Sequence, residues 1–257
     1  MTLYLLYCLL VIPQTFSQPS GINGIELVIA RYNEDLAWLK NSPYDGYIHS
    51  IYNKGPTPIP GVSADEVVIN LPNLGRESHT YLYHIITRYD SLSELTVFLP
   101  GSAEVHAVKN KILSHLFSTI ALTPLTNFPS SKYDEGILAK FDSFSLDQWM
   151  SRDTSNNAIN AERVLVPCLI RPFGAWFRSN FPNLPVIKPV AWMGIFAVAR
   201  EHIRQHPREY YEKLFTYVES SSNPECGHYF ERAWGAVFYP YPYSASDSQC
   251  PPLGHGL

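Results

Sequence analysis

Charge is scarce in this sequence and is not concentrated in any segment. Of 257 residues, 19 are basic and 23 are acidic, which gives a formal net charge of −4 at pH 7. Binding of DNA or RNA through the phosphate backbone depends on a basic patch or stripe, and the chain contains no block of like charges. We therefore expect no nucleic-acid partner.

Cysteine is also scarce. The four residues Cys8, Cys168, Cys226 and Cys250 are spaced too widely for a zinc site or a disulfide-rich scaffold. Cys8 lies in a leading segment that we expect to be removed, so an odd number remains and permits at most one internal disulfide. Cys226 with Cys250 is the pair that we would test first.

The sequence also lacks an internal repeat, which argues against a solenoid fold. It has no Gly-x-Ser-x-Gly elbow, so no local motif supports a serine hydrolase.

One apolar run lies at the start, Leu3 to Ile12, followed by Pro13 and by small residues before Gln18. This pattern is typical of a signal peptide, and the run is shorter than the about 20 residues that span a bilayer. We expect residues 1–17 to be a signal peptide, a secreted or secretory-lumen location, and no stable membrane span.

The remaining composition is that of a globular protein. It is 46% hydrophobic, 14% aromatic and 16% charged, which is sufficient for a core that offsets the entropy of folding. The length fits one α/β domain. We expect a single domain over residues 18–238 and a proline- and aromatic-rich tail over residues 239–257.

Short apolar runs alternate with amphipathic segments in the first half. This alternation predicts a mostly parallel central sheet flanked by helices, a three-layer α/β sandwich. The predicted strands are Glu26–Ala30, Tyr47–Tyr52, Glu66–Leu71 and Leu95–Leu99, and the predicted helices are Glu34–Lys40, with Asn33 as a possible N-cap, His79–Tyr89 and Val105–Ile120. Proline-rich long loops are expected from 123 to 190, followed by helices Val198–Gln205, Arg208–Glu219 and Tyr229–Phe238.

Polar residues follow each predicted strand. Ligands of open parallel sheets bind beyond the carboxyl ends of the strands. Arg and Lys suit a diphosphate, Asn and Asp suit ribose or sugar hydroxyl groups, and Gly allows close backbone approach. Enrichment of such residues is also a general property of turns, so ordinary caps and surface ion pairs are the alternative interpretation. The candidate donor-binding residues are Arg31, Asn33, Asn53, Lys54, Asn73, Gly75, Arg76, Glu77 and His79.

Five ordered blocks resemble an uncharacterised microbial, fungal and algal family that carries a domain of unknown function, the 3431 type. The blocks cover nearly the whole mature chain. They are Glu26–Leu39 with the Tyr52–Gly55 turn, Leu71–Leu82, Tyr89–Leu92 with Val97–Gly101, Gly194–Ile203 with Pro207–Tyr211, and Gly227–Trp234. The chain departs from the family pattern at Pro100, where the family usually has Gln.

The resemblance implies an organisation similar to that of GT-A glycosyltransferases, which transfer a sugar from a nucleotide-sugar donor to a hydroxyl acceptor. Tyr32-Asn33-Glu34 is similar to their first nucleotide-contacting loop, and Glu231-Arg232 is similar to their acceptor-side acid segment. The resemblance thus implies Glu231 or Asp35 as the catalytic base, and a nucleotide-sugar donor and a glycan or other hydroxyl acceptor as partners.

The metal clamp of GT-A enzymes, Asp-x-Asp after a central strand, is missing. The corresponding loop offers Glu104 and His106, with Asp90 as a further candidate ligand for Mn²⁺ or Mg²⁺. Either such a noncontiguous set holds a divalent cation, or a basic side chain such as Arg76 or Lys54 neutralises the leaving diphosphate.

Some of these residues have a second interpretation. Glu231 is either a general base or a buried partner of Arg76 or Arg200. A glycan hydrolase would need two carboxylates flanking one bond, for which Asp134 with Glu135 is the adjacent pair. A noncatalytic carbohydrate-binding or interaction protein on a degenerate glycosyltransferase fold is the alternative function.

Overall fold

The computed structural model describes residues 24–57, 59, 67–105, 107–122, 141–147, 165–182, 184 and 191–240. The expected signal peptide, the Asp134–Glu135 pair and most of the expected tail lie outside these residues. The expectation of a single domain over residues 18–238 stays a prediction.

A five-stranded sheet forms the centre of the molecule, in the order β3-β2-β1-β4-β5. β1 pairs in parallel with β2 and β4, and β2 pairs in parallel with β3, whereas β5 is antiparallel to β4. The mostly parallel sheet predicted from the sequence is therefore confirmed. The strands are β1 (Ile25–Arg31), β2 (Ile48–Asn53), β3 (Val67–Asn70), β4 (Leu95–Pro100) and β5 (Phe196–Ala199).

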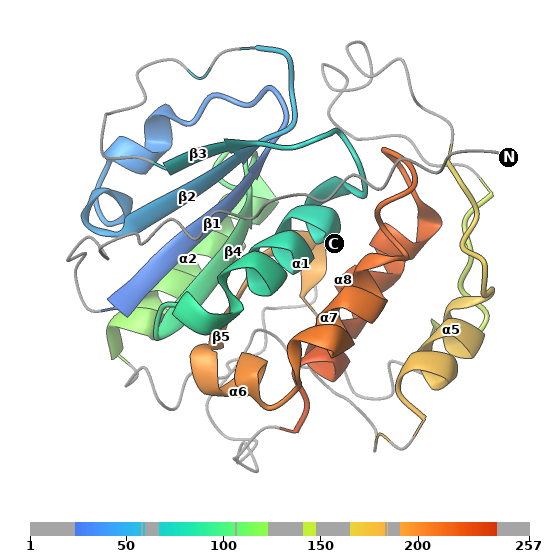
Figure 1. Ribbon diagram of the computed structural model, residues 1–257. Coiled ribbons are helices and arrows are strands. Elements are labelled where there is room, and N and C mark those ends of the chain that lie inside the picture. The colour runs from blue at the N-terminus through green and yellow to red at the C-terminus, as the bar shows by residue number, and fades with distance from the viewer. Residues whose placement is uncertain are drawn as a thin grey trace, which may run out of the picture.

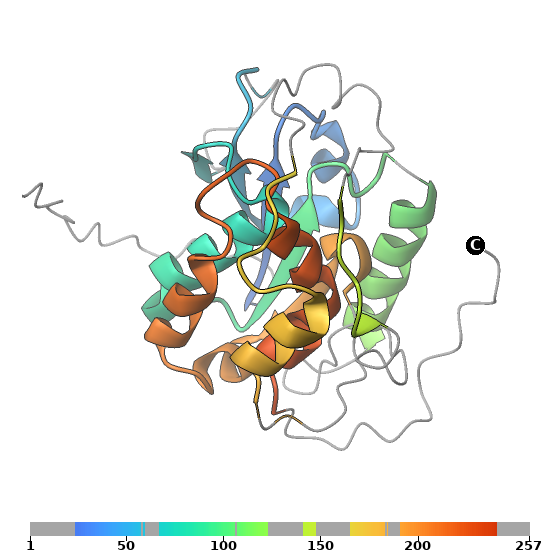
Figure 2. The same cartoon turned by 90° about the vertical axis from the view of Figure 1, so that its right-hand side faces the viewer.

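Helices cover both faces of this sheet (Figures 1 and 2). α2 (Ala107–Leu122) lies on one face, and α1 (Arg76–Arg88) and α8 (Glu225–Val237) lie on the other. Strand side chains alternate between two cores for this reason, with Leu27 and Val97 facing α2 and Val28 and Phe98 facing α1. The remaining helices are α5 (Phe173–Asn180), α6 (Arg200–Arg204), α7 (Arg208–Phe215) and the short turns η2 (Ala37–Lys40), η3 (Tyr44–Gly46), η4 (Tyr89–Ser91) and η6 (Trp192–Gly194).

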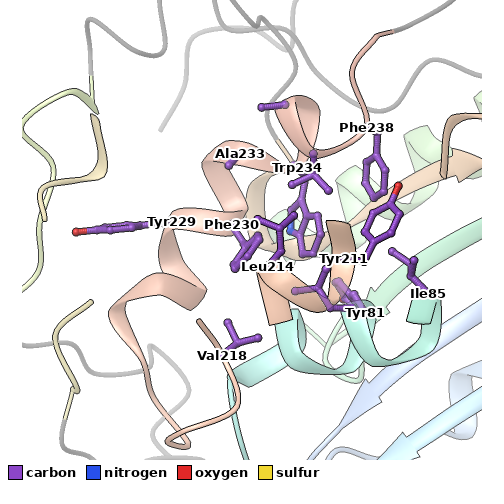
Figure 3. Packing of buried hydrophobic residues seen from close by; sticks show 14 of the residues in the cluster. Tyr81, Ile85, Tyr211, Leu214, Val218, Tyr229, Phe230, Ala233, Trp234 and Phe238 are labelled. Carbon is purple, nitrogen blue, oxygen red and sulfur yellow. The ribbon is translucent and has the colours of Figure 1, made fainter. Parts of the chain in front are cut away.

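Aromatic side chains fill the core on the α1 face (Figure 3). Trp234 of α8 is 1% exposed and lies with its ring centroid 5.1 Å from that of Phe196 on β5. Tyr81 of α1 packs against the same two rings, and its hydroxyl donates to the Gly194 carbonyl oxygen at 2.8 Å. This packing fixes α1, α8 and β5 relative to one another.

Several segments differ from the sequence predictions. Val198–Gln205, predicted as a helix, begins as the end of β5 and becomes α6 only at Arg200, because Phe196–Ala199 pairs with β4. Glu34–Lys40 forms only the 3-10 turn η2; Asn33 does not cap it, and Asp35 accepts from the Ala37 amide instead. The region predicted as loops also contains α5.

Cys226 is bonded to Cys168, which corrects the expected pairing with Cys250. The backbone around Val166 pairs with the start of α8: the Val166 amide donates to Asn223, and the Glu225 amide donates to Val166. This pairing brings the Cα atoms of the two cysteines to 5.2 Å. Cys250 lies outside the described residues.

Gly75, before α1, has a positive φ of 59° and is buried against the loop between α7 and α8. A Cβ atom at Gly75 would lie 2.1 Å from the Val218 carbonyl oxygen. Because this oxygen belongs to the backbone, it cannot move aside as the end of a flexible side chain could. We expect Gly75→Ala to lower the free energy of unfolding by about 2–4 kcal/mol, from left-handed strain plus overpacking, as measured by urea denaturation.

Gly227→Ala is the matched control for Gly75→Ala. Gly227 lies in α8, and its added Cβ would meet neighbours no closer than 3.7 Å. Alanine is the better helix former by about 1 kcal/mol, so this variant should be as stable as the wild type or more so. Equal stability of the Gly75 and Gly227 variants would contradict the tight fit at Gly75.

No helix in the described part of the chain is long and apolar enough to cross a membrane.

Candidate functional site

The carboxyl ends of β1 and β4, the amino end of β5 and the starts of α1 and α2 meet at one edge of the sheet (Figure 1). Glu77 in the first turn of α1 lies against the Gly194 backbone, where an added Cβ would be 3.0 Å from Glu77 Cγ. Gly194 donates to Ala191, which in turn donates from its amide to the Glu231 carbonyl oxygen. Thus the short turn η6 brings Glu77 and Glu231, far apart in sequence, to one place.

The two carboxylates interact electrostatically. Burial raises the pKa of Glu231 to about 7, with the nearby Glu77 carboxylate as the second cause; Arg232, Arg76 and Lys109 oppose the shift. Glu231 retains 22% of its side-chain exposure and Glu77 retains 15%. A carboxylate with a pKa near neutrality that still reaches solvent is suited to proton transfer.

Lys109, in the first turn of α2, is part of the same cluster. Its Nζ donates to Ser102 Oγ at 2.5 Å, and its ammonium interacts with the carboxylates of Glu77, Glu34 and Glu231. Burial lowers the pKa of Lys109, and these carboxylates oppose that change. Sequence reasoning missed this residue, because a lysine in a helix turn has no pattern that separates it from solvent-facing lysines such as Lys111.

Arg76 lies beside Glu77, with Nε 3.8 Å from Glu77 Oε2, and its side chain is 26% exposed. Its backbone has a φ of 51°, and Met193, just before β5, has a φ of 61°. Left-handed conformations at non-glycine residues are strained, and such strain concentrates at functional sites. Both strained residues flank the Glu77–Glu231 pair.

Several predicted donor-binding residues instead hold the loops of this edge together. Arg31 is buried, and its guanidinium donates to Asn53 Oδ1 at 2.6 Å and to the carbonyl oxygens of Thr57 and Glu34. Lys54 Nζ donates to the carbonyl oxygens of Leu74 and Arg76; burial lowers its pKa to about 7. These bonds fix the turns that present Arg76 and Glu77.

The other predicted residues also lie in these turns. Asn33 accepts from the Thr57 hydroxyl at 2.6 Å, and exposed Asp35 accepts from the Ala37 amide at the start of η2. Asn73 is half-buried before α1. Gly75 donates from its amide to the Ser221 carbonyl oxygen. His79 is buried and stacked on Tyr83; burial first, and then the Lys54 charge, lower its pKa to about 3, so it is neutral.

A family model described as "Protein of unknown function (DUF3431)" matches residues 27–252. The chain belongs to this family. No curated protein and no solved structure matches the chain. The DUF3431 region contains the whole cluster described above, from Glu34 to Glu231.

Glu104 and Asp90, two of the residues considered as metal ligands in this DUF3431 chain, do not come together. Glu104 interacts with Tyr44, which packs in the core on the α2 face, and Asp90 pairs with Arg208 at the opposite end of α1. His106 lies outside the described residues. Within the described ranges, no group of three or more His, Cys, Asp or Glu side chains is placed to hold a metal ion.

Arg200, considered as a partner of Glu231, donates to the Leu92 carbonyl oxygen at the far end of the sheet. Glu231 pairs with Arg232 instead, at 3.8 Å. Arg232 is itself packed over the ring of Phe144 at 3.8 Å and donates to the His228 carbonyl oxygen at 2.8 Å. Arg232 is therefore fixed beside Glu231.

Proposed function

We propose that this protein is a GT-A-like glycosyltransferase of the secretory pathway or extracellular space, which transfers a sugar from a nucleotide-sugar donor to a hydroxyl acceptor. The observation that carries the proposal is the convergence of Glu77, Glu231 and Arg76 at the carboxyl edge of a parallel sheet. Nucleotide ligands of open α/β sheets bind at this edge.

Glu231 is the proposed general base. Its raised pKa places the carboxylate close to the optimum for taking a proton from an acceptor hydroxyl near neutral pH. The acceptor oxygen then bonds to the anomeric carbon of the sugar, and the bond between that carbon and the diphosphate oxygen breaks. The electron pair of the broken bond stays on the diphosphate, whose charge the Arg76 guanidinium stabilises.

Glu77 has two proposed roles. Its carboxylate suits hydroxyl groups of the donor, and its negative charge is the second largest cause of the raised pKa of Glu231. Tyr81 is buried, and its hydroxyl donates a hydrogen bond to the Gly194 carbonyl oxygen. This hydrogen bond helps to fix the η6 turn, which lies against both Glu77 and Glu231.

The disulfide supports the proposed location. Disulfides persist in oxidising compartments such as the secretory pathway and the cell exterior. The Cys168–Cys226 bond joins the segment before α5 to the helix that carries Glu231.

A thermal-shift panel of nucleoside diphosphates and nucleotide sugars tests the proposal. A ligand at 100 times its Kd should raise stability by about 2.7 kcal/mol, and we expect one nucleotide class to do so in the wild type and not in Arg76→Met. Arg204→Met is the control, because Arg204 is exposed and bonds to Tyr89 and Asp90 at the other end of α1.

Absence of a shift with every nucleotide, with and without Mn²⁺ or Mg²⁺, would contradict the glycosyltransferase proposal. A response to free glycans without any response to nucleotides would favour the noncatalytic carbohydrate-binding alternative. A nucleotide response followed by release of sugar or of nucleoside diphosphate on addition of acceptors would support transfer.

A further inference from the structure

We propose that Lys109, together with Arg76, supplies the positive charge that binds the donor diphosphate, in place of a divalent metal ion. The inference rests on the proposed function and specifies how its site takes the donor.

The Lys109 ammonium has a fixed position at the edge of the sheet. Its Nζ donates to Ser102 Oγ at 2.5 Å, and Ser102 is buried in the turn directly after β4. The preceding residue, Gly101, approaches Glu34 so closely that an added Cβ would be 2.9 Å from Glu34 Oε2. The ammonium is therefore anchored between the ends of β4 and β1.

Carboxylates from three separate elements interact electrostatically with this ammonium. Glu77 comes from α1, Glu34 from the turn after β1 and Glu231 from α8, and each interacts with the Lys109 charge. Oxygen ligands of this kind are those that Mg²⁺ and Mn²⁺ prefer. Among the described residues, however, these three carboxylates do not form a group that could hold a metal ion, and the nearby ammonium would also repel a divalent cation.

The other candidate ligands do not provide a second metal site among the described residues. Glu104 interacts electrostatically with Tyr44, and Asp90 pairs with Arg208. Lys54, the other lysine considered for the diphosphate, has its Nζ bonded to two backbone carbonyl oxygens. Lys109 of α2 and Arg76 of α1 both interact electrostatically with Glu231.

These two cations provide the charge and the hydrogen-bond donors that a diphosphate requires. The guanidinium of Arg76 presents a planar fork for two oxygens, whereas the Lys109 ammonium is a compact charge. The two side chains come from different helices, and both interact with Glu231. A leaving diphosphate held between them would be next to the proposed base.

Isothermal titration calorimetry of the full chain with UDP, GDP and ADP tests this inference. We expect the nucleotide that binds the wild type to bind with the same affinity, within about twofold, in EDTA and in Mn²⁺ or Mg²⁺. Lys109→Met should weaken that binding at least tenfold, while Lys109→Arg, which keeps the charge, should retain most of it. Lys111→Met is the matched control, since Lys111 is exposed on the same helix, and should bind as the wild type does.

Binding to the wild type that requires an added divalent cation would overturn the inference and leave the proposed function standing. Unchanged affinity in a folded Lys109→Met variant, checked by thermal unfolding, would also overturn it. If Lys109→Met does not fold, two other measurements test the inference. They are the nucleotide affinity of the wild type in EDTA compared with Mn²⁺ or Mg²⁺, and the nucleotide affinity of Lys109→Arg. Lack of binding of any nucleotide under either condition would instead contradict the proposed function itself.

Discussion

Replacement of Glu225 by alanine should destabilise the protein more than any other single change considered for this chain, by about 3–5 kcal/mol. The Glu225 side chain is fully buried. Its Oε1 accepts from the Leu146 amide at 2.7 Å, and its Oε2 accepts from the Cys168 amide at 2.9 Å and from Arg171 Nε at 2.7 Å. Alanine would leave two amide donors and a guanidinium without their shared acceptor, and such losses cost more than the bonds themselves contribute.

The measurement is equilibrium unfolding in urea, with the midpoint and slope compared between variants. Glu225→Gln keeps the shape and one acceptor oxygen but loses the charge opposite Arg171, so its loss should be intermediate. Glu219→Ala removes an exposed acid near the end of α7 and should change stability by less than about 0.5 kcal/mol. If Glu225→Ala were as stable as Glu219→Ala, Glu225 would not hold the segments around Leu146 and Cys168 to α8.

Glu225 also illustrates why part of the fold was not predictable from sequence. It is an N-terminal helix acid, a common pattern, and nothing local shows that its carboxylate joins two distant segments. The same holds for Cys226: its partner Cys168 is set by the backbone pairing of Val166 with residues before α8. Contacts between such distant segments leave no periodic signal.

Strands and helices that bury a continuous apolar face were predictable, because burial imposes the period of the element on the sequence. β1, β2 and β4 were each predicted to within about two residues, as is usual for element ends. β5 was missed since Phe196–Ala199 is short and runs directly into α6 without a turn residue. Its strand conformation depends on pairing with β4.

The candidate site was also only partly predictable from the sequence. The family resemblance led to Glu231, and the structure brings Glu231 together with Arg76 and Glu77. The rule that ligands bind at the carboxyl edge of a parallel sheet led to Arg76 and Glu77. It could not separate these residues from Arg31, Asn53 and Lys54, whose polar groups satisfy the backbone and side chains of the same turns. A polar residue after a strand serves either purpose, and only the positions of its partners distinguish them.

Replacement of Glu231 by glutamine should abolish most turnover and remove a pH-dependent loss of stability. Without a general base, turnover should fall by about 100- to 10,000-fold, measured with the nucleotide-sugar donor that the thermal-shift panel identifies. The folded-state pKa of Glu231 is raised from 4.5 to about 7, so its contribution to stability is fully present below about pH 4.5 and is lost as the pH rises through about 7. Glu231→Gln has no titrating carboxyl group at this position, so its stability should not fall with pH for this reason.

We therefore expect the stability of Glu231→Gln relative to the wild type to increase between pH 4 and pH 8, by up to about 3 kcal/mol at roughly 1.4 kcal/mol per pKa unit. Urea unfolding at each pH measures the difference. Glu212→Gln, an exposed acid on α7, should show no such trend. A flat stability difference for Glu231→Gln would contradict the raised pKa.

Glu77→Gln distinguishes a base from a structural acid. Glu77 raises the pKa of Glu231 through its negative charge, so removal of that charge should lower the pKa and shift the acidic limb of the pH–rate profile to lower pH. At pH 8, any remaining difference in turnover between Glu77→Gln and the wild type would come from the contacts that Glu77 makes with the donor. If Glu231 served only to pair with Arg232, the pH–rate profile of Glu77→Gln would coincide with that of the wild type.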